Sequence, residues 1–283
     1  MSQAIQTAIV GVTGYAGAEL VRLLVRHPRL AGKPPVLAGR IEPEEESRGG
    51  IPLSQIHPAL IDSQGTGNLR LRQFRWEMIE DLGVDVLFLA TPHEYSRTAV
   101  FEARRRNIRV IDLSGAWRLE SSAHRAVYAF EDEGSADALA MQAEAVYGMP
   151  ELHRHALHGA GLIANPGCYA TAAILALKPL LAAGIVDPHC GIVCDAKSGV
   201  SGAGKAPTAK THFMYAADNF SAYGVFSHRH AGELIEQLEI DETSITFTPH
   251  LLPIPRGILA TQLRPLPGAA VADKDRCHLS RVL

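Results

Sequence analysis

Short apolar runs alternate with amphipathic stretches through the first half of the chain. Four of these runs predict strands, at residues 7–12, 36–38, 84–90 and 110–113. The run 84–90 is apolar almost throughout, as in a parallel strand buried on both faces. A helix with one apolar face follows the first strand, and a helix with a basic face is predicted over 96–106. This alternation predicts an α/β fold with a Rossmann-type, doubly wound parallel sheet, in a first domain over residues 1–150.

The second half of the chain has a different pattern. Its strands are predicted at residues 161–164, 191–195, 244–248 and 258–263, and its helices at 170–181 and 233–238. A long loop rich in glycine, serine and lysine spans 197–211. Because few helices separate the last strands, residues 151–283 predict an α+β domain.

Composition limits the partners and the location of the protein. Of its 283 residues, 47% are hydrophobic and 20% are charged, as a globular core requires, and the formal net charge is −3. That charge offers no basic surface to nucleic acid or to a membrane, and no apolar run approaches the roughly 20 residues of a membrane span. The N-terminus lacks the basic and apolar regions of a signal peptide. We therefore expect a cytoplasmic protein with no nucleic-acid or membrane partner.

The four cysteines do not form a disulfide framework in a chain of this length. Cys190 and Cys194 lie at a predicted strand, about 13 Å apart along it, which is too far for both to bind one ion. We expect both to be core residues, and Cys277 lies in a polar tail. The sequence therefore predicts no metal site.

A glycine-rich turn joins the first predicted strand to the first helix. Glycines at this place let the backbone approach a pyrophosphate, and the helix N-terminus supplies N–H donors. The second strand ends in Gly39-Arg40, and a basic residue there suits the 2′-phosphate of NADP better than the ribose hydroxyl of NAD. We expect NADP(H) to bind at Gly11, Thr13, Gly14, Tyr15, Ala16, Gly17 and Arg40.

Cys168 is the candidate nucleophile. The turn Asn165-Pro166-Gly167 leads from a predicted strand directly into a helix and places the thiol at the helix N-terminus. That position favours the thiolate, which is the reactive form.

Two further segments carry candidate chemistry. Residues 195–205 nearly match a nucleotide-binding P-loop, but Ala206 replaces the hydroxyl that would hold Mg²⁺, which argues against an NTPase. The segment Ser227-His228-Arg229-His230 carries two histidines that suit proton transfer near neutral pH. From the residues alone, either histidine is a candidate for the acid/base.

Taken together, these segments resemble the N-acetyl-γ-glutamyl-phosphate reductases from about Ala8 to Thr261. The matching segments are Gly11–Gly17, Ala90–His93, Asp112–Ser114, Tyr147–Glu151, Asn165–Tyr169, Ser198–Gly204, Asn219–Tyr223, His228–His230 and Pro255–Gly257. The resemblance implies a dinucleotide domain followed by a catalytic domain, a dimer or tetramer, and an acyl-phosphate substrate. It also implies a reaction in which Cys168 forms a thioester, expels phosphate, and receives hydride from NADPH to release a semialdehyde.

The resemblance also assigns roles to individual residues. It implies His228 as the acid/base, with His230 as the alternative, and Asn165 with the N–H of Cys168 as donors to the oxyanion. It places Arg118 at the substrate phosphate, which its planar fork suits. Lys197 would contact the substrate from the closing loop, and Pro92, Ser201 and Gly202 would lie at the cofactor.

Two alternatives stay open from the sequence. The same chemistry could act on another acyl phosphate, aspartyl or carrier-bound aminoadipyl, or the chain could be a truncated, non-catalytic dinucleotide-binding protein. Family members continue beyond the Arg-Gly-Ile segment to further strands and a return segment, which this sequence does not show after Leu263. A short helix over 269–283 would replace little of it, so we expect lower stability and weak ligand binding.

Overall fold

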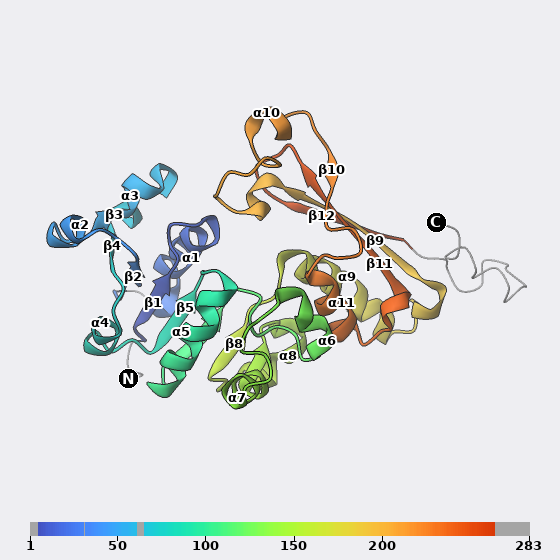
Figure 1. The fold of residues 1–283 in the computed structure, drawn as a ribbon, viewed down its shortest axis with the longest axis horizontal. Coiled ribbons are helices and arrows are strands. Elements are labelled where there is room, and N and C mark those ends of the chain that lie inside the picture. The colour runs from blue at the N-terminus through green and yellow to red at the C-terminus, as the bar shows by residue number, and fades with distance from the viewer. Residues whose placement is uncertain (1–4, 31, 61–64, 264–283) are drawn as a thin grey trace, which may run out of the picture. The chain divides into compact units, whose positions relative to one another are not determined.

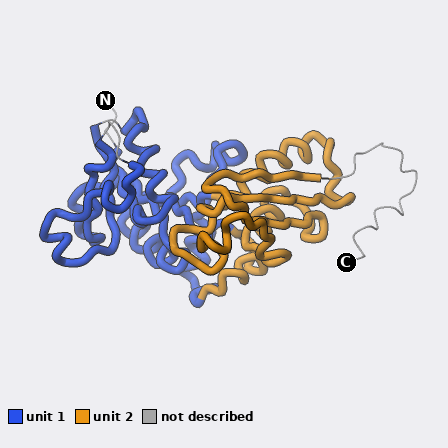
Figure 2. The backbone as a smooth tube through the Cα atoms, turned by 90° about the horizontal axis from the view of Figure 1, so that it is seen from above, with its two compact units in different colours: residues 1–118, 131–165 blue, residues 119–130, 166–283 orange. Residues whose placement is uncertain are grey.

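The computed structural model describes residues 5–30, 32–60 and 65–263, and the statements below concern those residues. The predictions about the segment after Leu263, including Cys277 and the short helix, fall outside them. The chain forms two compact units (Figure 2). Unit 1 comprises residues 1–118 and 131–165, and unit 2 comprises residues 119–130 and 166–283.

Unit 1 contains an eight-stranded sheet in the order β3-β4-β2-β1-β5-β6-β8-β7 (Figure 1). Its strands are β1 Thr7–Val10, β2 Val36–Gly39, β3 Ile51–Pro52, β4 Arg70–Gln73, β5 Val86–Leu89, β6 Arg109–Asp112, β7 Ala145–Tyr147 and β8 Leu162–Ala164. The pairs are parallel except β3 with β4. Strand β1 lies between β2 and β5, so the chain first builds the sheet on one side of β1 and then on the other. Such a reversal of strand order opens a ligand crevice at the carboxyl ends of the strands.

The helices of unit 1 connect these strands. They are α1 Tyr15–Val25, α2 Pro43–Ser47, α3 Leu53–Ile56, α4 Trp76–Asp81, α5 His93–Arg105, α7 Ala136–Glu144 and α8 Pro150–Leu157. Helix α1 and the segment 51–60 share one buried cluster with the sheet, which includes Ile9, Val12, Val21, Leu37, Leu53, Leu60 and Leu71. The segment between β2 and β4 is therefore part of the core of unit 1.

Unit 2 contains a four-stranded mixed sheet in the order β10-β11-β9-β12. The strands are β9 Ile192–Gly199, β10 Ser221–Ala222, β11 Ile245–Leu252 and β12 Ile258–Leu263, and the helices are α6 Ser122–Arg125, α9 Cys168–Ala182, α10 Phe213–Ala216 and α11 His230–Leu238. Strands β9 and β11 are parallel, and the two outer strands pair antiparallel. Helices α9 and α11 pack together, and α9 lies against β12. The α+β character of this half is confirmed.

The boundary between the units differs from the predicted position near Pro150. Strands β7 and β8 pair with each other and β8 pairs with β6, so the chain up to Asn165 belongs to unit 1. Residues 119–130 belong to unit 2 through contacts with α11, such as the 2.6 Å bond between His124 Nδ1 and Glu236 Oε1. Such long-range pairing has no local signal in the sequence.

The prediction that a loop begins at residue 197 is wrong. Strand β9 continues through Gly199, and a 3-10 turn, Val200–Ala203, follows it. That turn is bonded to the segment 254–257, since Val200 N donates to Ile254 O at 2.9 Å and Ser201 N to Pro255 O at 3.2 Å. The segment that includes Ser201 and Gly202 is therefore held by the backbone of a second segment.

Candidate active site

A cavity of about 770 Å³ lies at the carboxyl ends of the central strands of unit 1. Of the residues predicted to bind the cofactor, Gly11, Thr13, Gly14, Arg40 and Pro92 line it. Tyr15, Ala16 and Gly17 form the first residues of α1, and Ser201 and Gly202 belong to unit 2. The turn after β1 and the end of β2 therefore meet at one cavity in unit 1, as the sequence indicates.

Packing requires two glycines here, Gly11 in the turn after β1 and Gly17 in the first turn of α1. Gly11 has φ +98°, and a Cβ on it would lie 2.3 Å from the carbonyl oxygen of Ala90 at the end of β5. A Cβ on Gly17 would lie 2.3 Å from the Gly11 oxygen, so α1 approaches the turn very closely. Gly14 differs, because a Cβ there would meet only one atom, 3.6 Å away. Its missing side chain leaves room on the cavity side.

The loop that carries Arg40 is held by the neighbouring strand β4. Gln73 Oε1 accepts the Ile41 N–H at 2.9 Å, and the Phe74 N–H donates to Gly39 O at 2.8 Å. Gln73 and Phe74 also line the cavity, together with Thr91 and Tyr95. None of the four was predicted from the sequence as a site residue; for Gln73 and Phe74 the reason is that β4 is short and polar and carries no strand signal.

Cys168 is the first residue of α9, after the turn that leaves β8. Its side chain is exposed, whereas Cys194 is buried and Cys190 is intermediate. Gly167 is the N-cap residue of the helix, and its N–H donates to Glu233 Oε2 at 2.8 Å. The N–H of Cys168 is among the first four of the helix, which have no intrahelical acceptor. The thiol thus stands at a helix N-terminus whose entry is fixed by a buried carboxylate.

His230 is packed against this turn. It begins α11 and is 8% exposed, and its Nε2 lies 3.9 Å from Glu233 Oε1. A Cβ on Gly167 would lie 2.5 Å from that Nε2. Any side chain at position 167 would therefore collide with the His230 imidazole, so only a glycine fits directly before Cys168.

His228 supports His230 from the other side. Its Nδ1 accepts the backbone N–H of His230 at 3.1 Å, and the two ring centroids are 4.6 Å apart. Burial, with a smaller contribution from Arg229, lowers the pKa of His228 to about 4. His228 is therefore neutral at pH 7.

Two tyrosines complete this cluster. The Tyr223 hydroxyl donates to the Tyr169 hydroxyl at 3.3 Å, which donates to the His250 carbonyl at 2.9 Å. Burial raises the pKa of both phenols, and negative charge on Cys168 raises it further. Both therefore stay protonated and act as donors. Neither tyrosine was predicted from the sequence to have a role, although both lie in segments of the family pattern.

Glu233 was also missed. It is fully buried and contacts both His230 and the Gly167 N–H. A signal was present, since His230 and Glu233 are three residues apart in α11 and therefore lie on one helix face.

The structure does not bring Lys197 to this cluster. Lys197 forms an ion pair with Asp195, whose Oδ1 lies 3.1 Å from His250 Nδ1. Side chains alternate along a strand, so Lys197 points to the opposite face of β9 from Ser198, whose side chain is close enough to Tyr169 to lower its pKa.

Arg118 is 8% exposed, and its donors bind backbone carbonyls. Nε donates to Asn165 O and Nη2 to Leu113 O, both at 2.7 Å. The Asn165 N–H donates to Asp112 O at 2.8 Å. Arg118 thus joins the carboxyl ends of β6 and β8, directly before the turn to Cys168.

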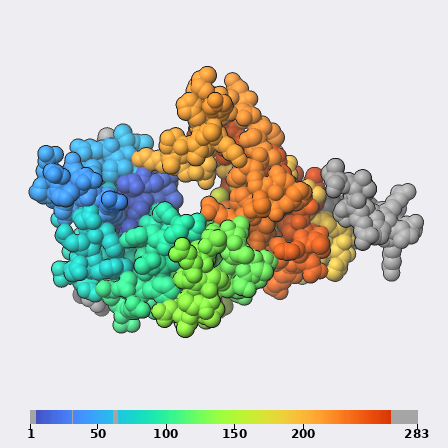
Figure 3. All heavy atoms as spheres, in the orientation of Figure 1, coloured from blue at the N-terminus to red at the C-terminus, as the bar shows by residue number. Residues whose placement is uncertain are grey.

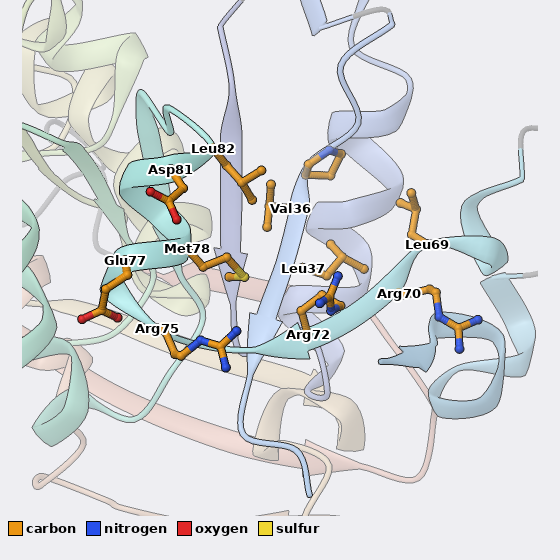
Figure 4. Close-up of a pocket in the computed structure, with 11 residues that line it drawn as sticks. Val36, Leu37, Leu69, Arg70, Arg72, Arg75, Glu77, Met78, Asp81 and Leu82 are labelled. Carbon is orange, nitrogen blue, oxygen red and sulfur yellow. The ribbon is translucent and has the colours of Figure 1, made fainter. Parts of the chain in front are cut away.

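A second cavity, of about 460 Å³, lies between β2, β4 and α4 (Figure 4). Its arginines are engaged: Arg72 Nη2 lies 2.8 Å from Glu46 Oε1, and Arg70 donates to the carbonyls of Gly49 and Gly50. The pKa of Glu46 is lowered most by the hydrogen bond from Arg72 and next by the hydrogen bond from the Gln73 N–H. These side chains hold the segment after β2 in place.

Within the described residues, three or more histidines, cysteines or carboxylates do not gather in a group that could hold a metal ion. A helix with the length and apolarity to cross a membrane is not found there either.

The chain is similar to known proteins over both units. Residues 6–160 match the family described as semialdehyde dehydrogenase, NAD binding domain, and residues 168–278 match semialdehyde dehydrogenase, dimerisation domain. An N-acetyl-gamma-glutamyl-phosphate reductase of Moorella thermoacetica is 40% identical over 275 residues, 96% of this chain and 75% of that protein. One of Desulforudis audaxviator is 42% identical over 278 residues, 97% and 75% of the two chains.

Solved structures share the fold at low identity. Aspartate semialdehyde dehydrogenase II of Vibrio cholerae, complexed with ASA, has a TM-score of 0.65 at 18% identity, covering 98% of this chain and 78% of that one. Aspartate semialdehyde dehydrogenase with NADP of Candida albicans has a TM-score of 0.56 at 14% identity, covering 96% and 75%.

The dinucleotide cavity, the thiol at a helix N-terminus and the two matched domains define a dinucleotide-dependent oxidoreductase of the semialdehyde dehydrogenase class. Within this class, the chain belongs to the N-acetyl-γ-glutamyl-phosphate reductase family. The predicted fold class, the enzyme class and the use of NADP(H) are confirmed by this membership.

Proposed function

We propose that the protein reduces N-acetyl-γ-glutamyl phosphate to N-acetylglutamate 5-semialdehyde and phosphate, with NADPH, in arginine biosynthesis. The observation that carries this proposal is the exposed Cys168 at the start of α9, with His230 and Glu233 set against Gly167. The family to which the chain belongs is named for this substrate.

The thiolate of Cys168 attacks the γ-acyl carbon, a C–S bond forms, and the acyl C–O bond breaks as phosphate leaves. The product is a thioester on Cys168. When bound, NADPH would supply the hydride that reduces the carbon of this thioester. The resulting thiohemiacetal oxyanion collapses, releases the aldehyde and returns the Cys168 thiolate. The N–H of Cys168 and the Asn165 amide are the proposed donors to that oxyanion.

The cavity of unit 1 fits the cofactor in two respects. Gly11 and Gly14 keep its floor free of side chains, as a pyrophosphate requires, and Arg40 provides a positive charge where β2 ends. Residues Thr13 and Pro92 line the same cavity.

We assign the acid/base role to His230 in preference to His228. At pH 7 a histidine with a pKa of about 4 is protonated in only about one molecule in 1,000, so His228 is a poor proton donor. Its neutral Nδ1 instead accepts from the His230 backbone. Glu233 Oε1 lies 3.9 Å from His230 Nε2, so a carboxylate stands beside the imidazole that we propose exchanges the proton with the thiol.

For Arg118 and Lys197 the geometry supports other roles than contact with the substrate. Arg118 already donates to two carbonyls at the ends of β6 and β8, so we propose that it positions Asn165. Lys197 is ion-paired with Asp195 on the opposite face of β9 from Ser198.

The decisive assay measures the reverse reaction, the oxidation of the semialdehyde. Phosphate-dependent reduction of NADP⁺ should occur with N-acetylglutamate semialdehyde and be far weaker with aspartate semialdehyde. Cys168→Ser should abolish this turnover while NADPH still binds, because the cavity lies in unit 1 and the thiol in unit 2. A serine variant that keeps most of the rate, or a preference for aspartate semialdehyde, would contradict the proposal.

We also propose a homo-oligomer that forms through unit 2. The matched family is described as a dimerisation domain. Residues with exposed side chains on the face of the sheet that carries Lys197 include Val193, Leu259 and Leu263. Apolar residues on an open sheet face favour burial against a second copy. We place the enzyme in the cytoplasm, where the reducing environment keeps Cys168 a thiol.

A further inference from the structure

His57 lies outside the cofactor cavity but contacts the turn that lines it. Its Nε2 is 2.8 Å from the carbonyl oxygen of Val12, in the turn between β1 and α1. A carbonyl oxygen can only accept a hydrogen bond, so His57 carries its proton on Nε2. His57 is 45 residues away in sequence, in the segment between β2 and β4.

The histidine is held on both sides by the core of unit 1. Its N–H donates to Leu53 O at 2.8 Å, and its carbonyl accepts the Leu60 N–H at 2.9 Å. Leu53 and Leu60, which flank it, are buried in the same cluster as Val12. The backbone that carries the imidazole is therefore held by the core of unit 1, independently of the turn that the ring contacts.

The bond sets the direction of a peptide group. In a planar trans peptide the C=O of one residue and the N–H of the next point in opposite directions. Since the Val12 oxygen points toward His57, the Thr13 N–H points away from it. Thr13 lines the cavity and His57 does not.

We propose that His57 is a positioning residue for the cofactor: it orients the Val12–Thr13 peptide so that the Thr13 N–H is a donor to the diphosphate of the dinucleotide. This inference rests on the proposed cofactor site. Without His57 the peptide can rotate and present the Val12 oxygen to the cavity, where it repels an anion. The bridging diphosphate is common to NADPH and NADH, so the effect of His57 is the same for both.

The test compares variants by equilibrium titration with three ligands. His57→Met keeps the apolar volume and removes the donor, and His57→Gln keeps a donor at a similar reach. His57→Met should weaken NADPH and NADH alike, by about 2- to 10-fold for one lost hydrogen bond. It should leave 2′-AMP, which lacks the diphosphate, unchanged. His57→Gln should bind all three as the wild type does.

Arg40→Ala provides the matched control. It should weaken NADPH and 2′-AMP and leave NADH unchanged, the opposite selectivity to His57→Met. If Arg40→Ala also has no effect, the cavity is not the cofactor site and the proposed function fails. If Arg40→Ala behaves as expected while His57→Met binds NADPH normally, or His57→Gln loses affinity as much as His57→Met, only the role of His57 is overturned.

Discussion

Gly167 lies in the turn that leads to Cys168 and packs against the first residues of α11. Replacement by alanine would place a Cβ 2.5 Å from His230 Nε2 and 2.7 Å from Glu233 Oε1. The backbone of Gly167, φ −67°, accepts any residue, so the effect is confined to these two side chains. Gly167→Ala should lower kcat by about 100-fold, the order expected for an ångström of misplacement. Steady-state kinetics check this, with an unchanged Kd for NADPH as the control.

His228 gives unit 2 a pH-dependent stability. Its pKa of about 4 in the fold compares with about 6.5 in the unfolded chain. Between these values the unfolded chain binds a proton that the folded chain does not, so stability is full above pH 6.5 and falls as the pH drops toward 4.

His228→Gln should therefore reduce the loss of unfolding free energy between about pH 7 and pH 5. Urea unfolding at the two pH values measures it. His158→Gln, at an exposed histidine, is the control and should retain the wild-type difference. An equal difference in both variants would refute the effect of His228.

At the scale of single residues, the sequence could predict those candidate residues whose position is set by their neighbours in sequence. Cys168 and the glycines after β1 could be predicted as candidates because a turn between a strand and a helix can be recognised from neighbours in sequence. Gln73 and His57 could not be found, because each acts through a contact with a segment more than 30 residues away. Lys197 was assigned wrongly to a loop, because β9 extends further than its apolar run.

Among the elements, the end of β2 is the one where we expect the choice between NADPH and NADH to be made. Arg40 lines the cavity on a loop held by β4. Arg40→Asp should weaken NADPH binding by about 1–3 kcal/mol more than NADH binding, because a charge-assisted bond to the 2′-phosphate becomes a repulsion. Fluorescence titration with both cofactors tests this. Equal losses for the two would show that Arg40 does not contact the phosphate.

The strands that the sequence predicted are those with apolar runs: β1, β2, β5, β6 and β8 of unit 1, and β9, β11 and β12 of unit 2. Strands β4 and β7 were not predicted, because β4 is Arg-Leu-Arg-Gln and β7 has only three residues. Helices α5, α9 and α11 begin earlier than predicted by two or three residues. Their N-cap residues are proline, glycine and arginine, so the usual Ser, Thr, Asp or Asn signal is missing.

At the scale of the whole molecule, unit 2 carries further exposed apolar residues. The α10 region, orange in Figure 3, protrudes from the rest of unit 2 and exposes Phe213, Met214 and Tyr215. Together with the open face of the sheet, it provides a large apolar surface in the unit matched to a dimerisation domain.

Leu259→Glu should weaken the homo-oligomer, because it places a charge on the open sheet face. Leu23→Glu is the matched control, since Leu23 of α1 is also 62% exposed but lies in unit 1. Sedimentation velocity should show smaller particles for the first variant and unchanged particles for the second. Identical behaviour of the two would place the interface elsewhere.

Residues 119–130 leave unit 1 and return to it, and this path has a consequence for synthesis on the ribosome. The N–H groups of Glu120 and Ser121 bond to Glu236, which is 116 residues later than Glu120. At about 5–20 residues per second, that partner is made about 6–23 s after the segment. Meanwhile unit 1 is completed as β8 emerges, and the segment waits as an unpaired loop. A chaperone at the ribosome exit would therefore meet this segment before its final contacts can form.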